Sequence, residues 1–282
     1  DNQGTGCTAR HMGCTHISES ENLRGRGERA RPSRALPKSY WTGTAGMKFL
    51  VTVMEFRIAL ARPRLLALNV MVPVVLVLAI SLGGAPEFHA AAVYTVLFTI
   101  FGTFGSAIPL VRDAEAGLFG RIIRAGVPPS HFLIERAAGG SAIDALQLLP
   151  ALTIATLGSI SLNGWIRAVL VLWSSIWIAN LLGNLVAAAA RSLAETALFS
   201  AVVTLFLLHL SGVFRTPLPQ SSWAVIEAFS PFQALHETLL TVSAGTSTEF
   251  PLGLVVWVLI LPVVTVLLAR SVTRSLRLAS DG

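Results

Sequence analysis

The chain carries few charges. Only 13% of its 282 residues are Asp, Glu, Lys or Arg, whereas 53% are hydrophobic. Ordinary soluble domains contain about 25% charged and about 45–50% apolar residues. Several apolar runs approach the roughly 20 residues that a helix needs to cross the hydrocarbon core of a bilayer. A soluble domain would have to bury all of these runs in one small core, so we predict an all-α, polytopic membrane protein.

Cysteine is almost absent, and both cysteines lie near the N-terminus. Cys7 and Cys14 stand near His11 and His16, but their spacing matches none of the common zinc patterns. We therefore expect no metal site in this stretch and no disulfide in the rest of the chain. Residues 1–46 are polar, rich in Gly, Ser and Arg, and without hydrophobic periodicity, which is typical of disorder.

The sequence also lacks motifs for nucleotide binding and catalysis. Its two lysines, Lys38 and Lys48, do not end a G-x-x-x-x-G-K-[ST] run, which excludes a P-loop ATPase. His236 and Glu237 begin a zinc-protease pattern, but Leu240 stands where the second His would be needed. The net charge of +6 comes from arginines that precede or flank apolar runs, so we expect no nucleic-acid partner. We expect neither a catalytic centre nor a cofactor in this chain.

Met47 opens a segment of different character, and we expect it to be the natural start. From Met47 to Arg62 the pattern is amphipathic, which favours a helix in the membrane interface that Pro63 ends. The alternative is that these residues are the frayed start of the first span. The apolar runs then predict six spans, near residues 65–82, 90–110, 137–160, 166–190, 196–214 and 251–269.

The positions of the arginines predict the orientation of these spans. With both termini in the cytoplasm, only Arg167 and Arg215 face outside, whereas the other arginines from Arg57 onward lie inside. Between the fifth and sixth spans, residues 215–249 hold apolar runs that are too short to cross and are punctuated by prolines. We predict an extracellular re-entrant helical hairpin there, covered by protein or water.

Charge is concentrated in one stretch, residues 111–136, between the second and third spans. A solvated loop is the simplest interpretation. However, Leu118, Phe119, Ile122 and Ile123 recur at helical spacing among charged residues, which predicts a short amphipathic helix with an exposed apolar edge. Such an edge favours docking of a partner protein.

Polar side chains inside the predicted spans are the other candidates for function: Asp144, Gln147, Asn180, Asn184 and His209. Such residues mark transport paths in some membrane proteins and join helices by hydrogen bonds in others, and both interpretations remain open. Asp144 could also lie near the cytoplasmic end and pair with a loop arginine. Asn180 and Asn184 are four residues apart and therefore share one helical face.

The charged stretch resembles a known family. Its segments Arg112–Gly117 and Arg124–Pro129 are similar to the first cytoplasmic loop of ABC-2 type transporter permeases. That loop has an acidic residue, a glycine, a proline-containing turn and a basic residue that opens the third span; the matching residues are Glu115, Gly117, Pro129 and Arg136. Residues 210–232 resemble the family's segment between spans five and six. The resemblance covers residues 47–278 and leaves 279–282 as a tail.

The resemblance implies a permease subunit of a bacterial ABC exporter, which moves a small amphipathic drug, antibiotic or lipid across the plasma (inner) membrane. A second permease, of the same or a sister chain, and a separate ATP-binding cassette subunit that holds ATP and Mg would complete the complex. The ATP-binding subunit would act on the charged stretch, at Arg112, Glu115, Gly117, Arg121, Arg124 and Pro129. The alternatives are a membrane enzyme that uses Asp144 or His209, and a membrane scaffold without transport.

Overall fold

The computed structural model describes residues 50–156, 161–190, 192–214, 222–243 and 251–280. These residues form helices joined by short turns, with no strand among them, so the predicted all-α fold is confirmed. The predicted N-terminal extension, residues 1–46, and the predicted start at Met47 lie outside the described residues. The domain boundaries at residues 47 and 278 stay predictions.

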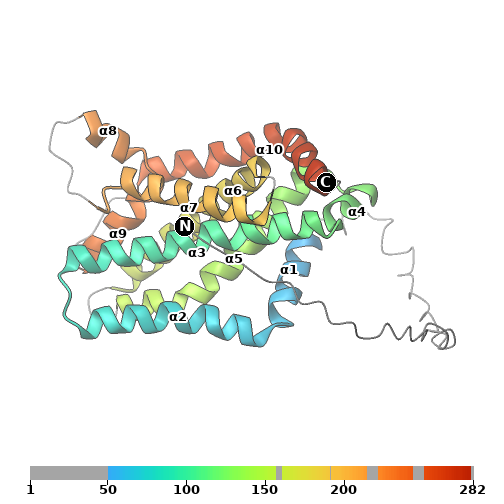
Figure 1. Cartoon of the computed structure of the whole chain (residues 1–282). Coiled ribbons are helices and arrows are strands. Elements are labelled where there is room, and N and C mark those ends of the chain that lie inside the picture. Colours follow the sequence, from blue (N-terminus) through green and yellow to red (C-terminus); the bar gives the residue numbers. More distant parts are fainter. Residues whose placement is uncertain (1–49, 157–160, 191, 215–221, 244–250, 281–282) are drawn as a thin grey trace, which may run out of the picture. The chain divides into compact units, whose positions relative to one another are not determined.

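Six helices in the described part of the chain are long and apolar enough to cross a membrane. They are α2 (Pro63–Leu82), α3 (Glu87–Glu115), α5 (Pro129–Ala155), α6 (Leu162–Ala189), α7 (Leu193–Leu210) and α10 (Leu252–Ser280). Figure 1 shows them running side by side along roughly one direction. The prediction of six spans is confirmed.

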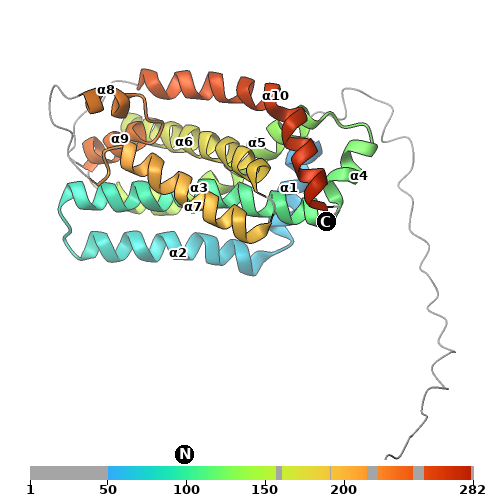
Figure 2. The same cartoon turned by 45° about the horizontal axis from the view of Figure 1, so that its top comes forward.

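Four shorter helices lie at the two ends of the long ones. They are α1 (Leu50–Leu60), α4 (Leu118–Arg124), α8 (Ser222–Ala228) and α9 (Gln233–Ser243). The helices α1 and α4 lie at one end with the last turns of α10, and α8 and α9 lie at the other (Figures 1 and 2). Helix α1 runs across its end of the bundle (Figure 1). The helix predicted near α1 is therefore present, while its place in a membrane interface and the re-entrant geometry of α8 and α9 stay predictions.

Three spans extend well beyond the apolar runs that predict them: α3, α5 and α10, which continues from residue 269 to Ser280. Helix α3 continues through Arg112 and Asp113 to Glu115, and α5 begins at Pro129, well before residue 137. Pro129 stands in the first turn of α5, where its missing N–H removes no hydrogen bond. A charged side chain ends an apolar run, but it does not interrupt the i to i−4 hydrogen bonds of the backbone. Much of the charged stretch is therefore helical continuation of two spans.

Helix α6 is the most buried of the long helices, and it packs most extensively against α3. A Cβ at Gly183 would overlap Ser106 Oγ, and a Cβ at Gly102 would lie 2.8 Å from the nearest α6 side chain. Glycine at these two positions lets the backbones approach closely, as small residues do in other membrane helix pairs. Thr204 Oγ1 donates a hydrogen bond to Thr103 Oγ1 at 2.9 Å, which joins α7 to α3.

Helix α2 is the least buried of the six spans. It packs chiefly against α5. Its remaining surface is apolar and exposed, with Leu65, Leu68, Met71 and Val75 among its residues. An apolar surface of this length requires lipid or another protein chain around it, as expected for a span in a bilayer.

Candidate functional site

Helix α4 is held against α5 by an aromatic contact. Phe119 is buried, and its ring packs edge-on against Phe132 of α5, with 5.3 Å between the ring centroids. The chain turns before and after α4 at two glycines with positive φ, Gly117 (68°) and Gly126 (92°). Glycine adopts this conformation without strain because it has no Cβ. The short helix predicted in the charged stretch is therefore present. Its position is fixed by the contact with α5 and by the glycine turns that precede and follow it.

The apolar residues of α4 are largely covered by the protein itself. Phe119 is buried, and Ile122 and Ile123 pack against the cluster at the ends of α3 and α5, which includes Leu110 and Phe132. This corrects the expectation of an exposed apolar edge. A helix of seven residues has only one apolar side, and here that side packs against two spans, so the side chains of α4 that are fully exposed are those of Arg121 and Arg124.

Charged residues remain exposed on and beside α4: Arg112, Glu115, Arg121 and Arg124. Arg121 Nη2 donates a hydrogen bond to Ala116 O at 3.0 Å, and Arg124 Nε donates to Gly120 O at 3.2 Å. The first of these bonds satisfies a carbonyl at the C-terminus of α3, where the helix dipole favours a cation. Both guanidinium groups are thus oriented by the backbone while they remain accessible to a partner.

A buried arginine joins three helices next to α4. Arg136 of α5 is only 5% exposed. Its Nη2 lies 2.8 Å from Asp113 Oδ2 of α3, and its Nη1 lies 3.3 Å from Glu55 Oε1 of α1. Its guanidinium carbon also lies 5.8 Å from the centroid of the Phe132 ring. We call Glu55, Asp113 and Arg136 the acid–arginine triad; it connects α1, α3 and α5, and through Phe132 it reaches α4.

The triad contains one more acid than base. Burial raises the pKa of Glu55 above its ordinary value of 4.5, the charge of Arg136 acts in the opposite direction, and Asp113 raises it further. Asp113 makes the shorter contact with the guanidinium, at 2.8 Å against 3.3 Å for Glu55. The surroundings of Glu55 thus favour its protonated form, mainly because the carboxyl group is buried.

Glu135 attaches α1 to α5 beside the triad. Its carboxylate accepts a hydrogen bond from Val51 N at 3.0 Å and lies 3.3 Å from His131 Nε2, and its backbone carbonyl accepts from Thr52 Oγ1 at 3.1 Å. Gly139 permits this approach, because a Cβ there would lie 3.2 Å from Thr52 Cα. The carboxylate satisfies an N–H in the first turn of α1, where such groups lack partners within the helix.

The expectation that the whole charged stretch lies in water is wrong, and two of its charged residues are among those that are buried. Glu135 and Arg136 are buried within α5. Burial of a charge is tolerated when partners neutralise it and satisfy its hydrogen bonds. One of those partners, Glu55, comes from a helix more than 70 residues earlier, so the local pattern around Arg136 contains no signal of its burial. The only hint in the sequence is a single acid on the largely apolar α1.

In the middle of the bundle, Asp144 of α5 pairs with an amide of α6. Asn180 Nδ2 donates to Asp144 Oδ2 at 3.2 Å and to Ile176 O at 3.1 Å. Asn184 Nδ2 donates to Leu133 O at 3.2 Å, so both asparagines bind α5 from one face of α6. The alternative expectation for Asp144, a place near the cytoplasmic end with a loop arginine, is wrong because the residue lies near the middle of its helix.

The remaining two polar candidates lie in different surroundings. Gln147 is buried one turn beyond Asp144 on α5, and it lines an apolar cleft of about 220 Å³ between α1, α2 and α5. His209 is exposed at the end of α7. Within the described ranges, no hydrogen bond or ion pair joins His209 to the other four. The structure thus joins Asp144 to Asn180, places Gln147 one turn further along α5, and leaves His209 apart.

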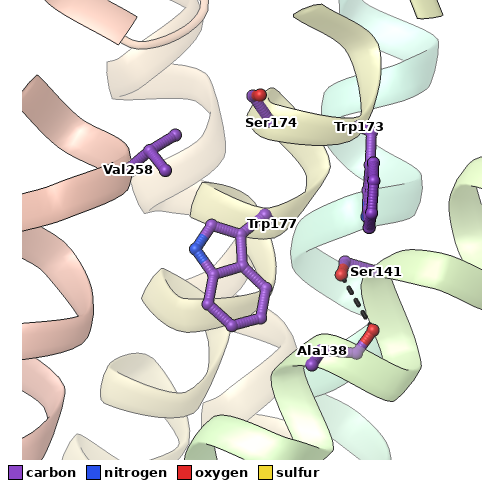
Figure 3. Close-up of a pocket in the computed structure, with 6 residues that line it drawn as sticks. All are labelled: Ala138, Ser141, Trp173, Ser174, Trp177 and Val258. Atoms are coloured by element: carbon purple, nitrogen blue, oxygen red, sulfur yellow. Dashed lines mark hydrogen bonds between the residues drawn. The ribbon is translucent and has the colours of Figure 1, made fainter. Parts of the chain in front are cut away.

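A second cleft, which the sequence did not predict, has a volume of about 320 Å³ and lies between α5, α6 and α10 (Figure 3). Its lining residues are Ala138, Ser141, Trp173, Ser174, Trp177 and Val258. Ser141 Oγ donates to Ala138 O at 3.0 Å, so its hydroxyl is engaged within its own helix. Trp173 and Trp177 are four residues apart, and this spacing also fits ordinary packing of a span, which is why the pattern alone does not indicate a cleft.

At the opposite end of the bundle from α4, His236 of α9 is buried. Its ring packs edge-on against Phe88 of α3, with 5.4 Å between the ring centroids. Burial lowers the pKa of His236, so the imidazole is neutral at pH 7. The hydroxyls of Ser211 and Ser230, 2.9 Å apart, join the end of α7 to the segment before α9. Among the described residues there is no group of three or more His, Cys, Asp or Glu that could hold a metal ion.

Comparison with known families identifies a match. A family model described as ABC-2 type transporter matches residues 47–242, which is more than half of the chain. The matched residues include α4, the acid–arginine triad and all five polar candidates of the spans. No curated protein matches the chain at a significant level.

Proposed function

Because the chain belongs to the ABC-2 type transporter family, we propose that it is the permease subunit of an ATP-driven export complex. The family comprises membrane subunits of transporters, and six long apolar helices make this chain a multi-pass membrane protein. In the proposed complex a separate subunit binds ATP and Mg, and a second permease, identical or a sister chain, forms the other half. The proposed location is the bacterial plasma membrane, with both termini in the cytoplasm. The proposed substrate is a small amphipathic drug, antibiotic or lipid.

The observation that carries this proposal is the attachment of α4 to the spans. Phe119 connects α4 to Phe132 of α5, and Arg136, one turn further along α5, connects it to α1 and α3. A displacement of α4 by an ATP-binding subunit would therefore reach three helices through close contacts. The residues proposed to receive or guide that displacement are Arg112, Glu115, Gly117, Arg121, Arg124 and Pro129.

Two roles can be separated within this set. The exposed side chains of Glu115, Arg121 and Arg124 offer charges to the partner, and two of them are already oriented by backbone carbonyls. Gly117 and Pro129 instead define the chain turn before α4 and the first turn of α5. Ion pairs across an interface contribute to specificity and rate of association more than to affinity. Charge reversal should therefore impair the productive engagement of the ATP-binding subunit.

The proposed substrate path contains the polar residues of the spans. Asp144 and Asn180 lie where α3, α5 and α6 meet, and Asn184 binds α5 closer to the end that carries α4. Gln147 lines the apolar cleft beside them. His209, exposed on α7, would contribute only if a second permease or the substrate covers that face.

The test is charge reversal on α4. The variant Glu115→Lys with Arg121→Glu, co-expressed with the proposed ATP-binding subunit, should lose ATP-dependent transport of substrate into inverted vesicles while it still inserts into the membrane. The matched control, Glu87→Lys with Arg167→Glu, makes the same exchange of charges near the starts of α3 and α6 and should keep export. Export by the α4 variant at the wild-type rate would refute the proposed docking role.

A further inference from the structure

Hydrogen-bond acceptors without donors gather in the middle of the bundle. Asn180 is fully buried, and its Oδ1 has no hydrogen-bond partner. Gln147 is 6% exposed, and its Oε1 likewise has none. Asp144 receives one hydrogen bond, from Asn180, and no basic side chain of the described ranges forms an ion pair with it. Buried acceptors of this kind are normally satisfied, so the group calls for a donor that the described residues do not supply.

Asp144 lies near the middle of α5, a helix long and apolar enough to cross the hydrocarbon core. Asp144 lies about 22 Å along α5 from Pro129, at about 1.5 Å per residue, and the hydrocarbon core is about 30 Å thick. An ionisable side chain at this depth is costly and marks a functional site by default. A structural hydrogen bond between helices would not need it, because a second amide could bind Asn180 without placing an acid in the membrane.

Two glycines let the acceptors pack directly against the backbone of a neighbouring helix. A Cβ at Gly105 of α3 would lie 2.8 Å from Asp144 Oδ2, and a Cβ at Gly140 of α5 would lie 2.7 Å from Asn180 Oδ1. Gly105 is itself exposed, and Asp144 is only half-buried. The carboxyl group therefore lies at an accessible edge between α3 and α5.

An apolar cleft lies beside the acceptors. It occupies about 220 Å³ between α1, α2 and α5, and Gln147 is its polar lining residue among apolar side chains such as Phe56, Ile143 and Leu146. Gln147 and Asp144 are three residues apart, so they are neighbours on the surface of α5. A ligand with one polar end could place that end at the acceptors and its apolar part in the cleft.

We propose that Asp144, Asn180 and Gln147 form a recognition site for the ammonium group of a cationic amphiphile, with the cleft between α1, α2 and α5 receiving its apolar part. An ammonium group brings both the positive charge and the hydrogen-bond donors that these three side chains lack. An anionic or purely acceptor headgroup would meet repulsion and leave the acceptors unsatisfied. The inference rests on the proposed transport function for its role in export, but the binding site itself is a property of this chain alone.

The test measures binding to the full chain in nanodiscs without the ATP-binding subunit. Three probes share a dansyl group and an undecyl chain and end in an ammonium, a hydroxyl or a carboxylate group. Energy transfer from the tryptophans of the protein to dansyl reports saturable binding. We expect the ammonium probe to bind at least tenfold more tightly than the hydroxyl probe, and the carboxylate probe to show no saturable binding. Equal affinity of the three probes would overturn the proposal whatever any variant does.

Variants assign the preference to the site. Asp144→Asn should abolish the tenfold preference for ammonium, whereas Asp144→Glu should keep most of it. Glu87→Gln removes the same charge at the exposed start of α3 and should change nothing. An unchanged preference in Asp144→Asn overturns the proposal. Because no ATP is involved, failed export by the whole complex with intact ammonium binding would count against the proposed function and not against this site.

A further arm identifies the source of the ammonium group. The binding is repeated in nanodiscs of phosphatidylethanolamine, whose headgroup carries an ammonium, and of phosphatidylglycerol, whose headgroup does not. Weaker probe binding in phosphatidylethanolamine, abolished by Asp144→Asn, assigns the site to a lipid headgroup. Equal binding in both lipids assigns it to an amphiphile that enters from outside the lipid pool. Binding of the ammonium probe that is identical in wild type and Asp144→Asn in both lipids refutes the site.

Discussion

Removing the charge of Arg136 tests whether the acid–arginine triad holds α1, α3 and α5 together. Arg136→Met keeps the length and apolar stem of the side chain but leaves Glu55 and Asp113 close together without a cation. Breaking a buried ion pair by removing one partner costs about 3–5 kcal/mol. The two carboxylates are 19% and 25% exposed, so water screens part of this cost. We therefore expect the free energy of unfolding to fall by about 3 kcal/mol, at the lower end of that range.

The assay is SDS titration of the purified chain in mixed micelles at pH 7.5, with helicity followed by circular dichroism. A companion variant, Glu55→Gln with Asp113→Asn and Arg136→Met, removes all three charges. It should recover most of the lost stability, because replacing a whole buried set of charges is often neutral. The free energy of unfolding of Arg136→Lys should lie between those of the wild type and Arg136→Met, since a single ammonium group cannot reach two carboxylates as the planar guanidinium does.

Two results would refute this reasoning. A loss below about 1 kcal/mol in Arg136→Met would mean that the triad contributes no more than an exposed surface pair. A triple variant as unstable as Arg136→Met would mean that the guanidinium stem, and not its charge, provides the stability, for instance through the Phe132 ring.

Three further predictions concern single sites. Gly183→Ala should lower the free energy of unfolding by about 1–3 kcal/mol in the same titration, because its Cβ would overlap Ser106 Oγ; wild-type stability would show that the contact between α3 and α6 can widen freely. The raised pKa of Glu55 means that the folded state favours the protonated carboxyl group. The contribution of Glu55 to the free energy of unfolding is therefore fully present below pH 4.5 and is lost as the pH rises through the raised pKa. Glu55→Gln should remove that decline, and a stability profile of unchanged slope would contradict the assignment. Phe119→Ala removes the ring that contacts Phe132 and should lower the free energy of unfolding by about 3–5 kcal/mol if the cavity stays open. It should also reduce the amount of substrate exported per ATP hydrolysed. A normal amount of export per ATP would show that α4 transmits its displacement through another contact.

The spans are predictable from the sequence because each apolar run must lie in hydrocarbon, whatever its neighbours are. Helix ends are less predictable, as α3 and α5 illustrate. Arg112 and Asp113 end the apolar run of α3, but the helix goes on to Glu115 because its backbone hydrogen bonds do not depend on side-chain polarity. The start of α5 has a clear local signal in Pro129, which apolar counting overlooks.

The candidate site is predictable in its residue types but not in its contacts. Asp144 and Asn180 are recognisable as polar residues in apolar spans, but their pairing depends on the relative positions of α5 and α6 along their axes. Burial of Arg136 depends on Glu55 and Asp113, which lie on two other helices. The coverage of α4 by α3 and α5 likewise needs the tertiary arrangement, because Phe119 and Ile122 look the same in sequence whether they face a partner or their own protein.

The order of the triad along the chain has a consequence for synthesis. The ribosome makes Glu55 and Asp113 before Arg136, and membrane chains acquire their structure from the N-terminus onward. Until α5 emerges, two carboxylates of the nascent protein have no countercharge and must remain in contact with water. The first two spans can therefore enter the bilayer early, but α1 can dock only after the arginine arrives. This end of the protein can assemble only after the third span, α5, has been made. A chain truncated before Arg136 should therefore contain inserted spans α2 and α3 but an undocked α1.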